Sequence, residues 1–289
     1  VNPLRATPDD GIEDFLEVPR FSTGYAALHH CIGFMPETHM LKPFADRYAS
    51  MRTLVEVVLA FTVVYAAQIQ ALRHAARQAA SAQRRWPVLW APDTERPSAF
   101  RFKGYAAVYR PSVLGDYSRL AYDRSQPWER DIPWYNRCVA ALEVDTPKWY
   151  LIPQAWREVI DRLQCNGVVV QRLASDQTLQ AQVYRIGNVV SRAQAYEGHL
   201  FHDVAEVSQH AESVQARAGD AVVDLAQPNA RYAVETLEPQ AHDSFFRWGF
   251  FNSVLEKKEA YSDYVFEDTA LEMLQAEPEL RARFEAWKQ

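Results

Sequence analysis

The sequence predicts a chain in two parts: an α/β portion made of one strand and a long helix, followed by a β-rich α+β domain that ends in helices. The apolar run at residues 31–35 is short and bounded, as expected of a strand in a covered sheet. Apolar residues then recur every three or four positions from Pro43 to about Gln83, which is the period of a helix. After Pro97 the chain divides into short strand-like segments separated by glycine and proline.

The composition is that of a globular protein with a hydrophobic core. Hydrophobic residues make up 48% of the 289 residues and charged residues 24%. The net charge of −6 argues against a general nucleic-acid-binding protein. The cysteines, Cys31, Cys138 and Cys165, form neither a C-x-x-C metal pair nor a disulfide framework, although one bridge among them stays open.

Glu37 falls at the carboxyl end of the predicted strand. Open α/β sheets place their chemistry at the carboxyl ends of strands, which makes Glu37 a candidate site residue. An acid that faces a helix N-terminus is the competing explanation, because Pro43 has the fixed φ suited to a first helical turn. The longest apolar stretch, residues 54–67, contains Glu56 and is too short to span a bilayer, so no membrane span is expected.

We place the domain boundary in the proline-containing segment at residues 84–97. The first domain is then residues 1–85 and the second residues 86–289. Within the second domain we predict strands at residues 100–109, 136–144, 168–173, 179–186, 203–207, 213–217, 221–225 and 232–237, and helices at residues 153–165, 244–258, 268–274 and 278–288.

Common catalytic motifs are missing from the sequence: it has no dinucleotide-binding or phosphate-binding glycine loop, no G-x-S-x-G and no H-E-x-x-H. Zinc-ligand types do occur at close spacing, at His199, His202, Glu206 and His210. The surrounding sequence has the pattern of strand and turn, which favours surface or interface histidines over a metal site and leaves the role of these histidines open.

A carboxylate at a strand end can deprotonate a metal-bound water when a metal ion is held opposite. Such a metal needs three protein ligands, and nothing before residue 37 supplies them. On the residues alone, Glu37 could therefore supply the proton acceptor of a hydrolytic site but not the ligands of its metal.

Several motifs resemble the C-terminal region of bacterial zinc carboxypeptidases of the M14, carboxypeptidase A-like family. The first are the stretch at residues 21–28 and the run Glu37-Thr38-His39 with the lysine and proline that follow it. The second half adds Ile152-Pro153-Gln154-Ala155-Trp156, Tyr184-Arg185-Ile186, Tyr196-Glu197-Gly198-His199, Arg217-Ala218-Gly219-Asp220, Leu237-Glu238-Pro239 and Tyr264-Val265-Phe266-Glu267-Asp268. The resemblance extends over nearly the whole chain.

The resemblance implies a zinc metallopeptidase that hydrolyses C-terminal peptide or amide bonds, with Glu37 as general base and acid. Residues 1–85 would be the closing strand and long helix of the catalytic domain, and residues 86–289 an accessory domain. Tyr25 lies near the substrate side of the family pattern. The chain has no His-x-x-Glu, so we expect the zinc ligands upstream and the chain to be the C-terminal piece of a longer enzyme; a degenerate homologue is the other explanation.

Under this interpretation the partners are a peptide or amide substrate and the missing N-terminal part of the catalytic domain, and a periplasmic or extracellular location is expected. Neither nucleic acid nor a membrane span is expected. The alternative is a non-catalytic β-rich module that binds peptide or envelope polymer. Its support is a possible binding face made by Trp128, Trp134, Trp149, Trp156 and Trp248, although large aromatic side chains more often anchor cores.

Overall fold

A computed structural model describes residues 2–256 and 262–288. The chain divides into two compact units, Val1–Phe250 and Phe251–Gln289. The first unit holds the strands and helices α1 to α5, and the second holds η2, α6 and α7. The boundary predicted from sequence, between residues 85 and 86, lies inside the first unit.

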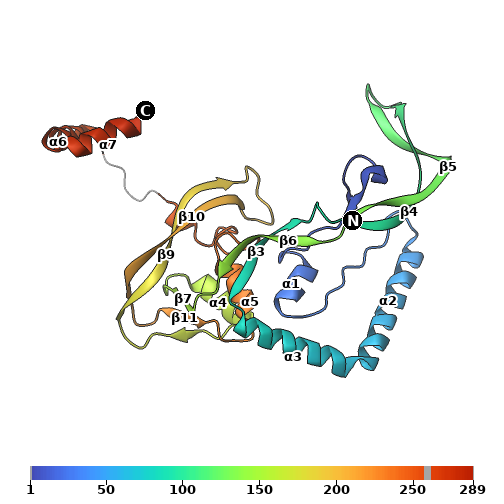
Figure 1. The fold of residues 1–289 in the computed structure, drawn as a ribbon, viewed down its shortest axis with the longest axis horizontal. Coiled ribbons are helices and arrows are strands. Elements are labelled where there is room, and N and C mark those ends of the chain that lie inside the picture. The colour runs from blue at the N-terminus through green and yellow to red at the C-terminus, as the bar shows by residue number, and fades with distance from the viewer. Residues whose placement is uncertain (1, 257–261, 289) are drawn as a thin grey trace. The chain divides into compact units, whose positions relative to one another are not determined.

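The elements follow one another in a mixed order (Figure 1). The helices are η1 (Pro8–Asp10), α1 (Ser22–Leu28), α2 (Phe44–Val64), α3 (Ala66–Ala82), α4 (Arg157–Cys165), α5 (Ala230–Leu237), η2 (Asn252–Val254), α6 (Asp263–Ala276) and α7 (Pro278–Lys288). The strands are β1 (Asn2–Pro3), β2 (Ile12–Glu13), β3 (Arg85–Pro92), β4 (Ser98–Pro111), β5 (Ser118–Tyr135), β6 (Cys138–Asp145), β7 (Trp149–Ile152), β8 (Gln171–Arg172), β9 (Gln177–Ser191), β10 (His202–Ala216) and β11 (Ala221–Asp224).

Among the described residues the strands form four sheets. One sheet has the order β1-β2-β5-β4, and its β2–β5 pair is parallel. The other strand pairs that the structure describes are antiparallel: β1–β2 and β4–β5 in the same sheet, the β9–β10 hairpin, the sheet β7-β11-β8 and the pair β3–β6. In β9 and β10 the register shifts at two places between residues 202 and 207, so the strands are irregular near the turn that joins them.

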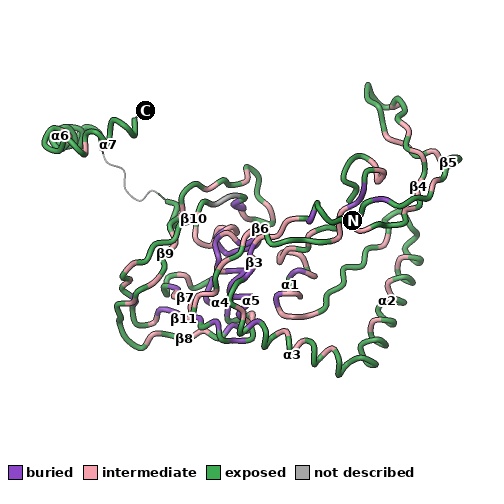
Figure 2. Tube along the Cα trace, viewed as in Figure 1, coloured by how far each residue is buried: buried purple, intermediate pink, exposed green. Residues whose placement is uncertain are grey.

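The core of the first unit lies around α4, α5, β11 and the segment that follows α5, where the buried residues gather (Figure 2). Helix α4 buries Val159, Ile160 and Leu163, which share one face because Leu163 lies four positions after Val159 and three after Ile160. Helix α5 is buried on almost every side: six of its eight residues are buried. This region therefore supplies most of the hydrophobic stabilisation of the unit.

An ion pair joins the beginning of the unit to its end. The Arg20 guanidinium lies 2.8 Å from the Asp243 carboxylate, and the two side chains are only 15% and 4% exposed. The Arg20 backbone N–H donates a second bond to Asp243, at 2.9 Å, and the guanidinium lies over the Phe201 ring, 4.4 Å from its centroid. Because little of either side chain is exposed, removing one partner would leave the other charge buried and uncompensated. The pair thus links two parts of the chain that are far apart in the sequence.

The long helix predicted from Pro43 to about Gln83 is two helices. Helices α2 and α3 meet at Tyr65, where their axes bend by 79°. Helix α2 contains no buried residue. No single helix among the residues that the structure describes is both long and apolar enough to cross a bilayer; the bent pair α2–α3 meets that test only when taken together.

Several other elements differ from the predictions. Residues 232–237, predicted as a strand, lie in helix α5, and residues 203–207 and 213–217 are parts of the single strand β10. Residues 244–251 form turns in place of a helix, with Gly249 at φ +81°, and η2 follows; residues 257–258 of that prediction lie outside the described part of the chain. The strands at residues 100–109 and 136–144 and the helix at residues 278–288 are confirmed by β4, β6 and α7.

Candidate functional site

Glu37 lies in an irregular segment between α1 and α2. Residues 31–39 have no strand pairing, so the prediction of a strand at residues 31–35 is wrong. The physical reason is that a strand needs a neighbour for its backbone groups, and no described strand lies beside this run, in which Ile32 is 64% exposed. Glu37 is exposed and forms no hydrogen bond or ion pair with the residues that the structure describes.

The start of this segment is fixed on helix α3. Arg73 donates from Nε to the His30 carbonyl oxygen at 3.0 Å, and one of its terminal nitrogens lies 3.0 Å from Cys31 Sγ. His30 has φ +53°, a left-handed conformation that reverses the chain after α1. Gly24 in α1 is also required, because a Cβ there would lie 2.2 Å from the Val18 carbonyl oxygen. The chain is therefore well anchored up to Cys31.

Tyr25, the predicted substrate-side residue, is 46% exposed and forms part of an aromatic cluster. Its hydroxyl donates to Asn166 Oδ1 at 2.5 Å, and its ring contacts His29 edge-on with 4.9 Å between centroids. His29 in turn stacks on Tyr232, with 5.5 Å between centroids. No hydrogen bond or ring contact joins Tyr25 to Glu37, so the structure does not bring the two predicted site residues together.

His29 and His30, the histidines that follow α1, are half-buried. Burial lowers the pKa of His29, and the positive charge of Arg77 adds to this effect. Burial also lowers the pKa of His30, with Arg231 as the next largest cause. The Nε2 atoms of both rings are buried and make no hydrogen bond with any residue that the structure describes. An imidazole can accept a proton or bind a metal, but two of them do not complete a metal site.

The zinc-ligand types at residues 199–210 do not converge. His202 is buried, and its Nδ1 is hydrogen-bonded with Ser191 Oγ at 2.8 Å. His210 is bonded through Nε2 with Ser208 at 3.1 Å, and His199 lies edge-on to Trp248. Across residues 2–256 and 262–288, no group of three or more His, Cys, Asp or Glu side chains could hold a metal ion.

The arginines that organise this region could not be recognised from the sequence. Arg73 belongs to the alanine- and arginine-rich second half of the helix predicted from Pro43 to about Gln83, where no motif distinguishes it from its neighbours. In the structure Arg73 lines a pocket of about 320 Å³ together with His30, Cys31 and Arg231. Arg231 donates to the Ala27 carbonyl oxygen at 3.0 Å and so fixes the end of α1. Only the spatial pairing of α1 with α3 and α5 shows these roles.

Comparison with known proteins finds carboxypeptidases. The chain is 30% identical over 110 residues to Carboxypeptidase 2 of Trichophyton tonsurans and, equally, of Trichophyton equinum; the match covers 38% of this chain and 20% of each relative. Carboxypeptidase 2 of Trichophyton rubrum is 30% identical over 103 residues, which is 36% of this chain and 19% of that protein. The chain thus spans about a fifth of the length of these relatives.

These relatives agree with the predicted resemblance in the type of enzyme but not in the source. They carry the name carboxypeptidase, in agreement with the predicted type of enzyme, but they come from fungi, whereas we had expected a bacterial branch. No protein-family profile matches the chain. No solved structure matches it either, so the carboxypeptidase-like fold of residues 1–85 stays a prediction.

Proposed function

We propose that this chain is part of a carboxypeptidase of the M14 type, in which Glu37 moves the proton during hydrolysis of a C-terminal peptide or amide bond. The observation that carries the proposal is the similarity to the Trichophyton carboxypeptidases. The run Glu37-Thr38-His39 supports it from the sequence. The Glu37 carboxylate is also exposed and engaged by no described residue, so it is available to a water molecule and a substrate.

Glu37 would act as a general base and then as a general acid. A carboxylate accepts the proton of the attacking water and passes it to the leaving amine, which is a typical use of glutamate in hydrolysis. The M14 resemblance implies zinc, but the described residues offer no set of ligands for it. We therefore assign no step through a metal to this chain, and the metal site, substrate and activity belong to the proposal for the whole protein.

Tyr25 is retained in the proposal as a residue on the substrate side. Its hydroxyl is bonded to Asn166, so direct contact with a substrate would require that bond to be exchanged. A positioning role, in which Tyr25 fixes α1 through Asn166 and His29, needs no such exchange.

The test is the substitution Glu37→Gln in the protein with its natural flanking sequence. We expect the release of C-terminal residues from a peptide, followed by chromatography, to fall by about 10²–10⁴-fold in kcat, because the amide cannot accept the proton. Glu56→Gln is the matched control, since Glu56 is another exposed carboxylate, on α2, and should leave kcat unchanged. Wild-type kcat in Glu37→Gln would overturn the assignment of Glu37.

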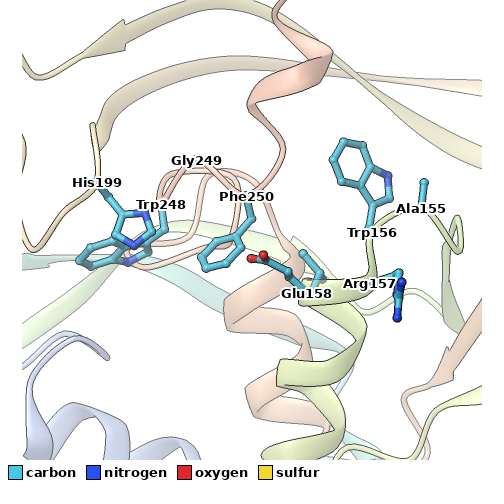
Figure 3. A pocket seen from close by; sticks show the side chains of 9 residues that line it. Ala155, Trp156, Arg157, Glu158, His199, Trp248, Gly249 and Phe250 are labelled. Atoms are coloured by element: carbon cyan, nitrogen blue, oxygen red, sulfur yellow. The ribbon is translucent and has the colours of Figure 1, made fainter.

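The second candidate, a non-catalytic polymer-binding module, rests on the tryptophans. The structure does not gather the five of them on one face: Trp128 and Trp134 lie on β5 beside Phe102 and Phe100, and Trp149 lies on β7. The remaining two, Trp156 and Trp248, line one pocket of about 400 Å³ beside the start of α4 (Figure 3).

A further inference from the structure

The outer end of the β4–β5 hairpin has no core of its own. Beyond the register shift that follows Tyr105, residues 106–111 pair with residues 118–123, and residues 112–117 connect the two strands. None of residues 103–130 is buried (Figure 2). A two-stranded ribbon that is exposed on both faces is only marginally stable in water. The outer end therefore lacks a stabilising partner among the described residues.

The apex of the hairpin is apolar and almost fully exposed. Val113 is 96% exposed and Leu114 is 88% exposed. The backbone that carries them is fixed: the Ser112 N–H donates to the Tyr117 carbonyl oxygen at 2.8 Å, and the Leu114 N–H donates to Ser112 Oγ at 3.1 Å. In water these two side chains contribute no hydrophobic stabilisation, whereas their transfer into an apolar phase would be favourable.

Tyrosine rings lie behind the apex. Tyr117 belongs to the connection, and Tyr109 and Tyr122 lie on the paired parts of β4 and β5. The three rings are 46–61% exposed. A tyrosine side chain has an apolar body and a polar tip, so it is suited to a place where one side is apolar and the other is wet.

Two arginines face each other across the same part of the hairpin. Arg110 pairs directly with Arg119, and like charges in this position repel each other. Neither guanidinium forms a salt bridge with a side chain that the structure describes. Asp123 feels the charge of Arg110, but its oxygens already accept from Ser125 and Gln126. An anion supplied from outside the fold would relieve the repulsion between the two arginines.

These features follow one another along the hairpin: an apolar apex, and then a zone that holds both tyrosines and arginines. Strands rise about 3.3 Å per residue, so the arginine pair lies roughly 10 Å behind the apex. A bilayer has the matching order, with hydrocarbon first and then an interface where tyrosine is enriched and anionic headgroups attract basic side chains. We propose that the outer end of the β4–β5 hairpin inserts, apex first, into the surface of an anionic lipid bilayer.

The attraction to lipid is local. The whole chain has a net charge of −6, so anionic headgroups repel it on average. Between residues 109 and 121 the sequence has two arginines and a single acid, Asp116, so this end carries 2 − 1 = +1. The inference goes beyond the proposed peptidase function, because the hairpin end does not include Glu37.

The test is flotation of the full chain with vesicles of phosphatidylcholine alone and of equimolar phosphatidylcholine and phosphatidylglycerol. We expect binding to the anionic vesicles, weakened by added salt because salt screens the arginines. Changing Val113→Ser and Leu114→Ser together should weaken that binding about tenfold or more, because the apolar apex is lost. Changing Arg110→Gln and Arg119→Gln together should remove the preference for anionic vesicles, and Asp116→Asn should strengthen it.

Val169→Ser is the matched control, because Val169 is 60% exposed and lies outside the hairpin, so binding should be unchanged. Circular dichroism verifies that each variant is folded. The proposal is overturned if the chain does not float with anionic vesicles at low ionic strength, or if flotation survives the double change at the apex. It is also overturned if sedimentation shows that the apex joins two copies of the chain in solution. Glu37→Gln should float like the wild type, which separates this surface from the proposed function.

Discussion

Residues 220–246 and residues 32–64 are both rich in apolar side chains, yet they are buried to opposite extents (Figure 2). In the first segment Val223, Ala233 and Val234 are completely buried. In the second, Leu41 and Val63 are about four-fifths exposed. The difference shows that apolar composition determines what a segment can bury, whereas burial itself depends on which partners the fold brings to it.

The largest expected effect comes from the ion pair that closes the buried region. Asp243→Ala leaves the Arg20 guanidinium without its carboxylate and removes the hydrogen-bond acceptor of Trp248. We therefore expect the free energy of unfolding to fall by about 3–5 kcal/mol. Urea denaturation at neutral pH measures this change. Glu56→Ala breaks an exposed pair with Arg52 and should change stability by no more than about 0.5 kcal/mol. Similar losses in the two variants would contradict the contrast between the regions.

A leucine from each environment gives the next comparison. Leu163 in α4 is 0% exposed and Leu59 in α2 is 60% exposed. Leu163→Ala should destabilise the protein by about 2–5 kcal/mol, because it removes contacts and leaves a cavity. Leu59→Ala should stay within about 0.5 kcal/mol, as expected of a surface change. If Leu59→Ala proved as costly as Leu163→Ala, α2 would have to be packed against something in solution.

The smallest effect is a dependence on pH in the buried region. His242 Nε2 accepts a hydrogen bond from the Trp90 backbone N–H at 2.9 Å, and burial, with Arg247 as the next cause, lowers the pKa of His242 below 6.5. The unfolded chain then takes up a proton more readily than the folded one, so stability is complete above about pH 6.5 and falls as the pH decreases through the folded pKa.

The variant His242→Gln isolates this effect, because the amide oxygen can accept the same hydrogen bond without titrating. Between pH 7 and pH 5 the wild-type protein should lose more thermal stability than the variant, measured by calorimetry at each pH. The pKa values of His29 and His30 are also lowered, but both histidines are present in the wild type and in the variant. Their contributions to the pH dependence therefore cancel in the comparison. Equal slopes for the two proteins would show that His242 does not contribute.

Local sequence was sufficient to predict the type of an element where that element has one polar and one apolar side. The segment at residues 100–109 alternates in β4, and residues 153–165 contain the amphipathic helix α4. It was insufficient at residues 232–237, because α5 is buried almost all round and therefore loses the period that distinguishes a helix from a strand. It also failed at residues 31–35, where the apolar run has no neighbouring strand among the described residues.

The candidate site was predictable only as separate residues. Glu37 and Tyr25 stand out from the sequence through motif resemblance, but the fold gives Tyr25 its partners Asn166 and His29 and leaves Glu37 with none among the described residues. The anchoring by Arg73 and Arg231 arises from contacts between segments far apart in the sequence. No periodicity or spacing carries that information.

The pairing of Arg20 with Asp243 has a consequence for how this protein can be divided. A fragment that begins at residue 86 would retain most of the buried core. It would lack Arg20, however, so the buried Asp243 carboxylate would have no guanidinium to balance its charge. Supplying residues 1–85 as a separate polypeptide should then restore stability in trans, and the gain should disappear when the added polypeptide carries Arg20→Ala. Cooperativity of folding, more than the course of the chain, would then define what counts as one domain here.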